Sequence, residues 1–452
     1  MRQISRSFCV SRRRWLRTSV FAVASVVALP LVFSGCGNSS NGNSTSTTGG
    51  GGGGGSTVRI LSPHGDEITN EFRTAFNAKY PNIKLEFVNQ DGSGGIAKYV
   101  LSQFKGKGPD QGINFDIMFG GGAEIFQDID DAKALQPLAS TYNLPKELNG
   151  VPLYAPDKNW VGAALSGFGI LANKSIADRD GLPLPKSWAD FADAKYKGRI
   201  ELADPRQSGS SHTIDEVILQ TNGWEKGWQI LTAMAANSSG FISISSQLLS
   251  DVKGGQAVFA PAIDFYGRTA VADSGGKLVY IEPQGQNIIT PDPIGLLRGA
   301  PNKADAQKFV DFVMSTEGQK LWMFKKDTPG GPKGNTLYRQ SALPALYQPI
   351  SGDSTITTDP YKTKTDRDFD SKMATERYRP LNDLIGSVLV DNLSLLKRAW
   401  SANPDASKVA YLPVTEKELA ELTKKWDDPA FRSTTMAKWK TDAVAKYNGL
   451  AS

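Results

Sequence analysis

Residues 58–88 read VRILSPHGDEITNEFRTAFNAKYPNIKLEFV and decide the fold class of this chain. β-type runs stand at both ends, at 58–62 and 83–88. Between them apolar side chains recur at helical spacing from Ile68 to Phe76, and a Tyr-Pro pair ends the predicted helix. A β-α-β unit of this kind has parallel strands, with ligand-binding loops at their carboxyl ends. The segment therefore predicts an α/β fold.

The same order of elements recurs downstream. A helix is predicted near 96–104 and a strand at 115–119, and the glycine turn at 120–122 opens a further helix. Two later apolar segments, 160–171 and 292–298, are predicted strands at which the chain crosses between lobes. We therefore expect two lobes joined by crossing strands.

Composition shifts along the chain predict its organisation. The run after the leader holds only uncharged Gly, Ser, Thr and Asn and is expected to be a flexible coil, and the last hundred residues show helical periodicity. A capping box is expected at Thr415 and Glu418. The predicted parts are a signal peptide (1–36), a flexible linker (37–57), the first part of lobe I (58–167), lobe II (168–290), the second part of lobe I (291–345) and a helical C-terminal extension (346–452).

The positive charge of the chain lies in its leader. The chain has 51 Lys and Arg against 46 Asp and Glu, a net charge of +5. Residues 1–35 contain six arginines and no acidic residue, so 45 basic residues face 46 acidic ones in the rest. No basic run there has interleaved aromatic residues, so nucleic acid is not expected as a partner.

The leader carries export signals. The stretch 11–17, SRRRWLR, resembles the twin-arginine motif, and an apolar run at 19–33 follows it. Ser34 and Gly35 before Cys36 resemble a lipobox, which predicts that Cys36 is acylated and anchors the protein to a membrane. The alternative is an ordinary signal peptide in which Cys36 is incidental. The expected location is the periplasm or the cell surface, as a membrane-anchored lipoprotein.

Signals of enzyme chemistry are weak. Cys9 and Cys36 are the only cysteines, and His64 and His212 the only histidines. The sequence lacks the hydrolase, zinc-protease and P-loop motifs. The predicted protein is therefore not an enzyme, although a triad of His212 with a neighbouring serine keeps an exported hydrolase as the rival hypothesis. A surface adhesion module is a third, weaker possibility.

The segment ADPRQSGSSHT, residues 203–213, points to a ligand. It precedes a predicted helix, and free N–H groups at a helix start bind anions. Arg206 is expected to add a bidentate clamp. The alternative is that Ser210 or Ser211 only caps the helix.

From residue 58 to about 346 the chain resembles the periplasmic substrate-binding proteins of ABC importers, in the group that includes ferric-iron, thiamine and phosphosugar binders. The segments that carry the resemblance are SPHGDE (62–67), FGGGA (119–123), ADPRQSGSSH (203–212), AIDFY (262–266), PDPI (291–294), APN (300–302) and EGQKLW (317–322). The resemblance implies a two-lobed type II periplasmic-binding-protein fold with hinge closure. It also implies a small-molecule ligand, a membrane permease as partner, no cofactor and a monomer.

The helix start and the resemblance together predict the binding residues. They are Pro63, His64, Gly65, Gly120, Gly121, Gly122, Arg206, Ser208, Gly209, Ser210, Ser211, His212, Asp264, Tyr266 and Asp292. Asp264 is expected to meet hydroxyls or an amine of the ligand, and Tyr266, Phe168 or Trp160 to offer apolar surface. Core packing is the alternative for Phe168 and Trp160.

The resemblance also bears on the ligand. Ferric-binding members carry two adjacent tyrosines where this chain has Phe265 and Tyr266. With one phenolate missing, we predict no metal and a small organic anion, such as a phosphorylated or carboxylated metabolite. The alternatives are ferric iron held by His64 and Tyr266, and thiamine or its phosphate.

Overall fold

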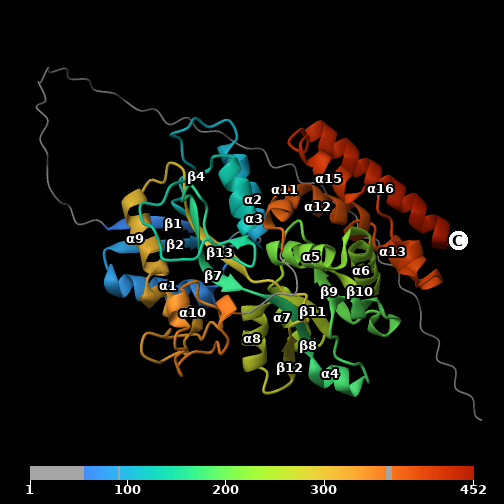
Figure 1. Cartoon of the computed structure of the whole chain (residues 1–452), viewed down its shortest axis with the longest axis horizontal. Coiled ribbons are helices and arrows are strands. Elements are labelled where there is room, and N and C mark those ends of the chain that lie inside the picture. Colours follow the sequence, from blue (N-terminus) through green and yellow to red (C-terminus); the bar gives the residue numbers. More distant parts are fainter. Residues whose placement is uncertain (1–54, 90–91, 363–368, 452) are drawn as a thin grey trace, which may run out of the picture. The chain divides into compact units, whose positions relative to one another are not determined.

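The computed structural model describes residues 55–89, 92–362 and 369–451. These described residues form one compact unit with its own core (Figure 1). The signal peptide, Cys36 and most of the 37–57 linker lie outside the described residues, so the predictions made for them stay predictions. In the described ranges no helix is both long and apolar enough to span a bilayer.

Lobe I is built on a six-stranded sheet with the order β2-β1-β3-β13-β4, in which β7 also pairs with β13. Its strands are β1 (Ser56–Leu61), β2 (Ile83–Val88), β3 (Ile117–Phe119), β4 (Leu135–Gln136), β7 (Trp160–Ser166) and β13 (Thr290–Leu297). β1 is parallel to β2 and β3, whereas β13 is antiparallel to its neighbours. The β-α-β prediction is confirmed. A separate hairpin joins β5 (Glu147–Leu148) to β6 (Val151–Pro152).

Helices cover both faces of this sheet. They are α1 (Asp66–Lys79), α2 (Gly92–Phe104), α3 (Ala123–Asp131), α9 (Lys303–Met314) and α10 (Thr316–Met323). Ile60 packs in the core cluster of α1, α9 and α10, while its neighbour Leu61 packs in the cluster of α2 and α3. Successive strand residues thus face opposite layers, because side chains alternate across a sheet. α2 begins earlier than the helix predicted near 96–104, because Gly92 to Gly95 form its first turn.

Lobe II is built on a five-stranded sheet with the order β10-β9-β11-β8-β12. Its strands are β8 (Phe168–Asn173), β9 (Ile200–Ala203), β10 (Ser238–Ile242), β11 (Phe259–Ile263) and β12 (Leu278–Ile281), and its helices are α4 (Lys174–Arg179), α5 (Gly209–Asn222), α6 (Trp224–Asn237), α7 (Gln247–Gly254) and α8 (Asp264–Ala272). Only Gly167 separates β7 from β8, so the chain crosses between the sheets there. It returns between β12 and β13.

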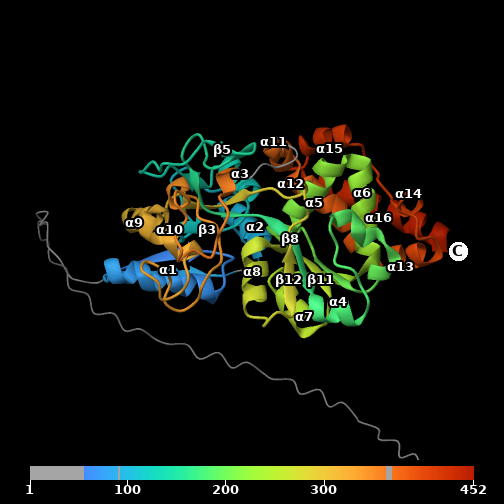
Figure 2. The ribbon, with the colours of Figure 1, turned by 60° about the horizontal axis from the view of Figure 1, so that its bottom comes forward.

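The C-terminal extension is helical and packs on α5 and α6 (Figures 1 and 2). Its helices are α11 (Ser371–Glu376), α12 (Tyr378–Ile385), α13 (Leu393–Ala402), α14 (Ala406–Val409), α15 (Glu416–Thr423) and α16 (Pro429–Ala451), with a π-helical turn at Gly386–Val390. Pro380 lies inside α12, and Leu396 lies on the separate helix α13. The capping box of Thr415 and Glu418 is confirmed.

Candidate functional site

A cavity of about 250 Å³ lies between the two lobes. Its lining comprises Pro63, His64, Asn89, Gly92, Ser93, Gly121, Gly122, Ser166, Phe168, Gln207, Ser208, Gly209, Ser210, Thr213, Ser243, Ile244, Ser245, Ser246, Ile263, Phe265, Tyr266, Thr290, Pro291 and Asp292. Both lobes contribute, and hydroxyl and glycine residues dominate. We call this space the interlobe cavity.

The starts of several helices meet at the interlobe cavity. Gly92 opens α2, Gly122 is the N-cap of α3, and Ser208 is the N-cap of α5, its hydroxyl accepting from the Ser211 N–H. The starts of α7 and α8 also reach the lining through Ser246 and Ile263. Each helix start carries partial positive charge and N–H groups that lack a partner within the helix. Together they favour a negatively charged group in the cavity.

The two lobes touch at the starts of α2 and α5. The Gly209 N–H donates to Ser93 Oγ at 3.2 Å, and the Gly94 N–H donates to the Gln207 carbonyl at 3.3 Å. Lys98 Nζ donates to the Arg206 carbonyl at 2.8 Å. These contacts close one side of the interlobe cavity.

The glycine turn after β3 allows a close approach that a side chain would block. Gly120 has a φ of +98° and Gly121 a φ of +122°, which favour glycine. A Cβ atom on Gly120 would lie 2.6 Å from Nε2 of His64. The turn therefore brings the start of α3 against the His64 loop.

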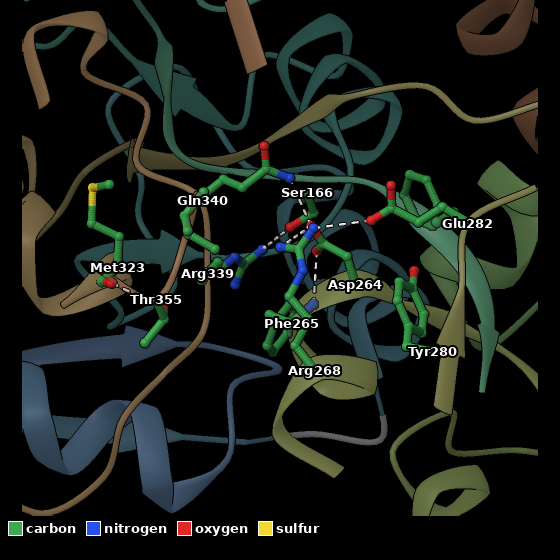
Figure 3. A network of polar contacts seen from close by, with 12 residues as sticks. Ser166, Asp264, Phe265, Arg268, Tyr280, Glu282, Met323, Arg339, Gln340 and Thr355 are labelled. Carbon is green, nitrogen blue, oxygen red and sulfur yellow. Dashed lines mark hydrogen bonds and ion pairs between the residues drawn. The ribbon is translucent and has the colours of Figure 1, made fainter. Parts of the chain in front are cut away.

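Asp292 is the one carboxylate in the described lining, and the buried Arg339 beside it balances its charge. Its oxygens accept hydrogen bonds from the Gly121 N–H and from Nη2 of Arg339. Arg339 is fully buried, also donates to Ser166 Oγ at 3.1 Å, and lies 4.2 Å above the ring of Phe265 (Figure 3). The lining itself contains no Lys or Arg among the described residues. An anion here would meet neutral donors.

His64 is a neutral polar group in the wall of the cavity. It is only 5% exposed, and burial lowers its pKa to about 4, so the ring is uncharged at pH 7. Its Nε2 lies 4.0 Å from Asp292 and has no hydrogen-bond partner among the described residues. A buried nitrogen without a partner is available to a ligand.

The structure brings nine of the fifteen predicted binding residues to the cavity. They are Pro63, His64, Gly121, Gly122, Ser208, Gly209, Ser210, Tyr266 and Asp292. It places six outside the lining: Gly65, Gly120, Arg206, Ser211, His212 and Asp264. Phe168 lines the cavity, whereas Trp160 lines a separate one beside α3.

The contacts of Arg206 correct the expectation that this residue clamps an anion. Its Nη2 pairs with Asp204 at 2.7 Å and with Asp391 of the extension at 2.9 Å. Its guanidinium lies so close to Gly386 that a Cβ there would be 2.7 Å from Cζ. The arginine therefore ties the loop before α5 to the extension and does not face the cavity.

His212 and Asp264 also point away from the cavity. Nδ1 of His212 is 2.8 Å from Oδ1 of Asn382 in α12, and its ring is fully buried. Asp264 Oδ2 accepts from Gln340 at 2.7 Å and pairs with Arg268 at 2.8 Å (Figure 3). Asp264 therefore belongs to a polar network between the lobes. Among the described residues no serine hydroxyl bonds to His212, so the triad gains no support.

Sequence reasoning missed several lining residues that lie on loops. The largest group is Ser243 to Ser246, between β10 and α7. A serine-rich run between a strand and a helix is a signal that would have found it, because such loops lie at strand ends. Asn89, Gln207 and Thr290 carry no comparable local signal.

The side chains near the cavity do not form an evident metal centre. The described ranges contain no group of three or more His, Cys, Asp or Glu residues placed to hold an ion. His64, Tyr266 and Asp292 do line the same cavity. However, burial raises the pKa of the Tyr266 phenol and so disfavours the phenolate form that would bind a metal. In addition, Asp292 is already paired with Arg339.

Known proteins are similar to this chain in sequence or in fold. The phosphoglycerate transport regulatory protein PgtC of Salmonella typhimurium is 23% identical over 308 residues, covering 67% of this chain and 71% of that protein. The major ferric iron-binding protein of Neisseria meningitidis is 25% identical over 260 residues, covering 55% of this chain and 76% of that protein. The periplasmic binding protein AfuA of Actinobacillus pleuropneumoniae, solved with fructose-6-phosphate bound, has a TM-score of 0.60 at 18% identity, covering 74% of this chain and 99% of AfuA.

The likeness to AfuA supports the two-lobed type II periplasmic-binding-protein fold. A family model described as bacterial extracellular solute-binding protein matches residues 115–342, half of the chain. The matched range runs from before β3 to beyond β13 and so spans both lobes and the residues on either side of the cavity. This chain belongs to the bacterial extracellular solute-binding protein family.

Proposed function

We propose that this protein captures a small organic anion outside the cytoplasm and delivers it to the membrane permease of an ABC importer. The observation that carries the proposal is the meeting of the starts of α2, α3 and α5 at one interlobe cavity. The relatives support the class of ligand, since PgtC is named for phosphoglycerate transport and AfuA was solved with fructose-6-phosphate. A lipid on Cys36 would keep the monomeric protein near its permease.

The proposed ligand has two unlike ends. Its anionic group lies at the starts of α3 and α5, where Gly122 and Ser210 offer N–H and hydroxyl donors. Hydroxyl or amine hydrogens at the other end face Asp292 and Thr290, and the ring of Tyr266 covers the apolar part. A cavity of about 250 Å³ suits a small metabolite. Nothing in this arrangement requires the protein to make or break a bond.

Ferric iron is the second candidate, because His64, Tyr266 and Asp292 line one cavity. The organic anion is favoured over iron because burial disfavours the Tyr266 phenolate and because Asp292 is already paired with Arg339. Thiamine phosphate falls within the organic-anion class.

A panel of sugar phosphates, phosphoglycerates, thiamine phosphate and ferric citrate tests the proposal. Each compound is added to the full chain and scored by thermal shift, then by calorimetric titration. A ligand at a hundred times its dissociation constant should stabilise the fold by about 2.7 kcal/mol. An organic anion that binds supports the proposal. Binding of iron alone, or of no compound, contradicts it.

Two neighbouring serines give a matched pair of variants for the best ligand. Ser210 lines the cavity, whereas Ser211 does not. Loss of one donor to a charged group should weaken binding by about tenfold or more in Ser210→Ala. Ser211→Ala should leave the affinity unchanged. Equal affinities in the two variants would show that the anion binds elsewhere.

A further inference from the structure

We propose that three consecutive residues of the extension, Arg377-Tyr378-Arg379, join α3 of lobe I to α5 of lobe II and thereby fix the spacing of two helix starts that line the interlobe cavity. We call these residues the clasp. They are positioning residues, since none of them lines the interlobe cavity. The inference concerns how the cavity is held together, and it rests on the proposed function only where ligand binding is measured.

Arg377 holds the lobe II side. Its Nε and Nη2 donate to the two carboxylate oxygens of Glu216 in α5, each at 2.7 Å, and its Nη1 donates to Glu416 at 2.6 Å. The side chains of Arg377 and Glu216 are 2% and 0% exposed. A buried bidentate pair of this kind fixes both distance and orientation. Arg377 therefore fastens the start of α12 to α5.

Tyr378 reaches both helices. Its ring meets the His212 ring of α5 edge-on, with centroids 4.3 Å apart. The same ring belongs to the core cluster of α2 and α3, with Ile96 and Phe126. Most apolar residues of the extension, such as Leu381, pack instead in the cluster of α5 and α6. Tyr378 is thus an apolar bridge from the extension into lobe I.

Arg379 holds the lobe I side. Its Nε pairs with Asp128 of α3 at 3.3 Å, and its Nη1 pairs with Asp427 of the extension at 2.8 Å. Ser371, just upstream, adds a hydrogen bond from its hydroxyl to the Gly150 carbonyl of lobe I at 2.9 Å. Figure 2 shows α11 and α12 lying beside α3 and α5. Moving the lobes apart would break the Arg379–Asp128 contact.

The clasp holds both helices within about two turns of their starts. α3 begins at Ala123 and is held at Asp128, and α5 begins at Gly209 and is held at Glu216. At about 1.5 Å per residue, the grip lies roughly 8 Å and 11 Å from the respective starts. A helix is rigid over such a length, so a fixed contact there fixes the helix start as well. The family model ends at residue 342, so the clasp lies outside the matched range.

Label distances measured without added ligand test the clasp directly. Cys9 and Cys36 are the only cysteines of the chain, so Cys9→Ser and Cys36→Ser leave the body free for labels. Spin labels are placed on Lys84→Cys in lobe I and Lys277→Cys in lobe II, both exposed. We expect one narrow distance in the parent chain. Arg379→Ala and Tyr378→Ala should both give longer and broader distributions.

Conservative and remote variants distinguish loss of the interlobe contacts from a general disturbance of the fold. Tyr378→Phe keeps the ring and should match the parent distance. Lys408→Ala removes a lysine of the extension that is 64% exposed and pairs with Asp405, the N-cap of its own helix, and this variant should also match. If Tyr378→Ala does not fold by circular dichroism, Asp128→Ala becomes the second variant, since it removes the Arg379–Asp128 contact from the α3 side. An unchanged distance in Arg379→Ala and in Tyr378→Ala or its replacement overturns the proposal.

Ligand binding is a second measurement, and it distinguishes failure of the clasp from failure of the proposed function. If opening of the lobes lowers the population of the binding-competent form, affinity for the panel ligand should fall about three- to tenfold in Arg379→Ala. Failure of every ligand to bind would contradict the proposed function and leave the label distances as they are. Intact binding with identical distances in all variants would contradict the clasp alone.

Discussion

At the scale of single residues, His64 in the cavity wall makes the stability of the fold depend on pH. Burial excludes the protonated ring, and the nearby Asp292 only partly offsets this because Arg339 neutralises it. The unfolded chain takes up a proton at His64 as pH falls below about 6.5, while the folded chain does so only near 4. The fold therefore gains stability from a neutral His64 above about pH 6.5 and loses it as pH falls toward 4.

Unfolding in urea at pH 7, 5.5 and 4.5 measures this contribution. The parent chain should lose about 2.4 kcal/mol more between pH 7 and 4.5 than His64→Gln, because the variant cannot take up the proton. The difference between the two proteins isolates His64 from other titrating groups. Glu124, whose pKa burial raises to about 7, works in the opposite direction in both. Parallel curves for the two proteins would contradict the lowered pKa.

At the scale of elements, local signals were predictable and distant partners were not. The β-α-β unit, the start of α5 after Ser208 and the capping box before α15 each depend on residues only a few positions apart. Arg206 stands beside that helix start and therefore suggested an anion clamp. Its partner Asp391 lies 185 positions away, and no local pattern reveals such a pairing. The serine loop before α7 differs from Arg206, because its serine-rich run between a strand and a helix is a local signal.

Arg206→Ala distinguishes a structural tie from a ligand clamp. Loss of the pairs with Asp204 and Asp391 should lower the free energy of unfolding by about 1–2 kcal/mol, since the side chain is 21% exposed. Ligand affinity should change by less than about threefold. Arg199→Ala, which removes a more exposed pair with Asp180, should cost much less. A large loss of ligand affinity at unchanged stability would instead support Arg206 as a ligand clamp.

At the scale of the whole molecule, the extension is part of the core of lobe II. The indole N–H groups of Trp224 and Trp228 in α6 donate to the carbonyls of Val414 and Tyr411, at 3.0 and 2.9 Å. The sequence predicted helices in the extension but did not predict that they pack on lobe II, because the contacts join residues about two hundred positions apart. The excess charge lies in the leader, so the near-neutral body offers an anion no long-range attraction. Selectivity must come from the cavity.

A crystal structure of the protein with its best panel ligand shows directly whether helix starts hold the anion. We expect the anionic group within hydrogen-bond distance of donors at the starts of α3 and α5, at Gly122 and Ser210, with no Lys or Arg side chain in contact. The opposite end should face Asp292. An anion held by lysine or arginine, a metal bound through Tyr266, or a ligand outside the interlobe cavity would contradict it.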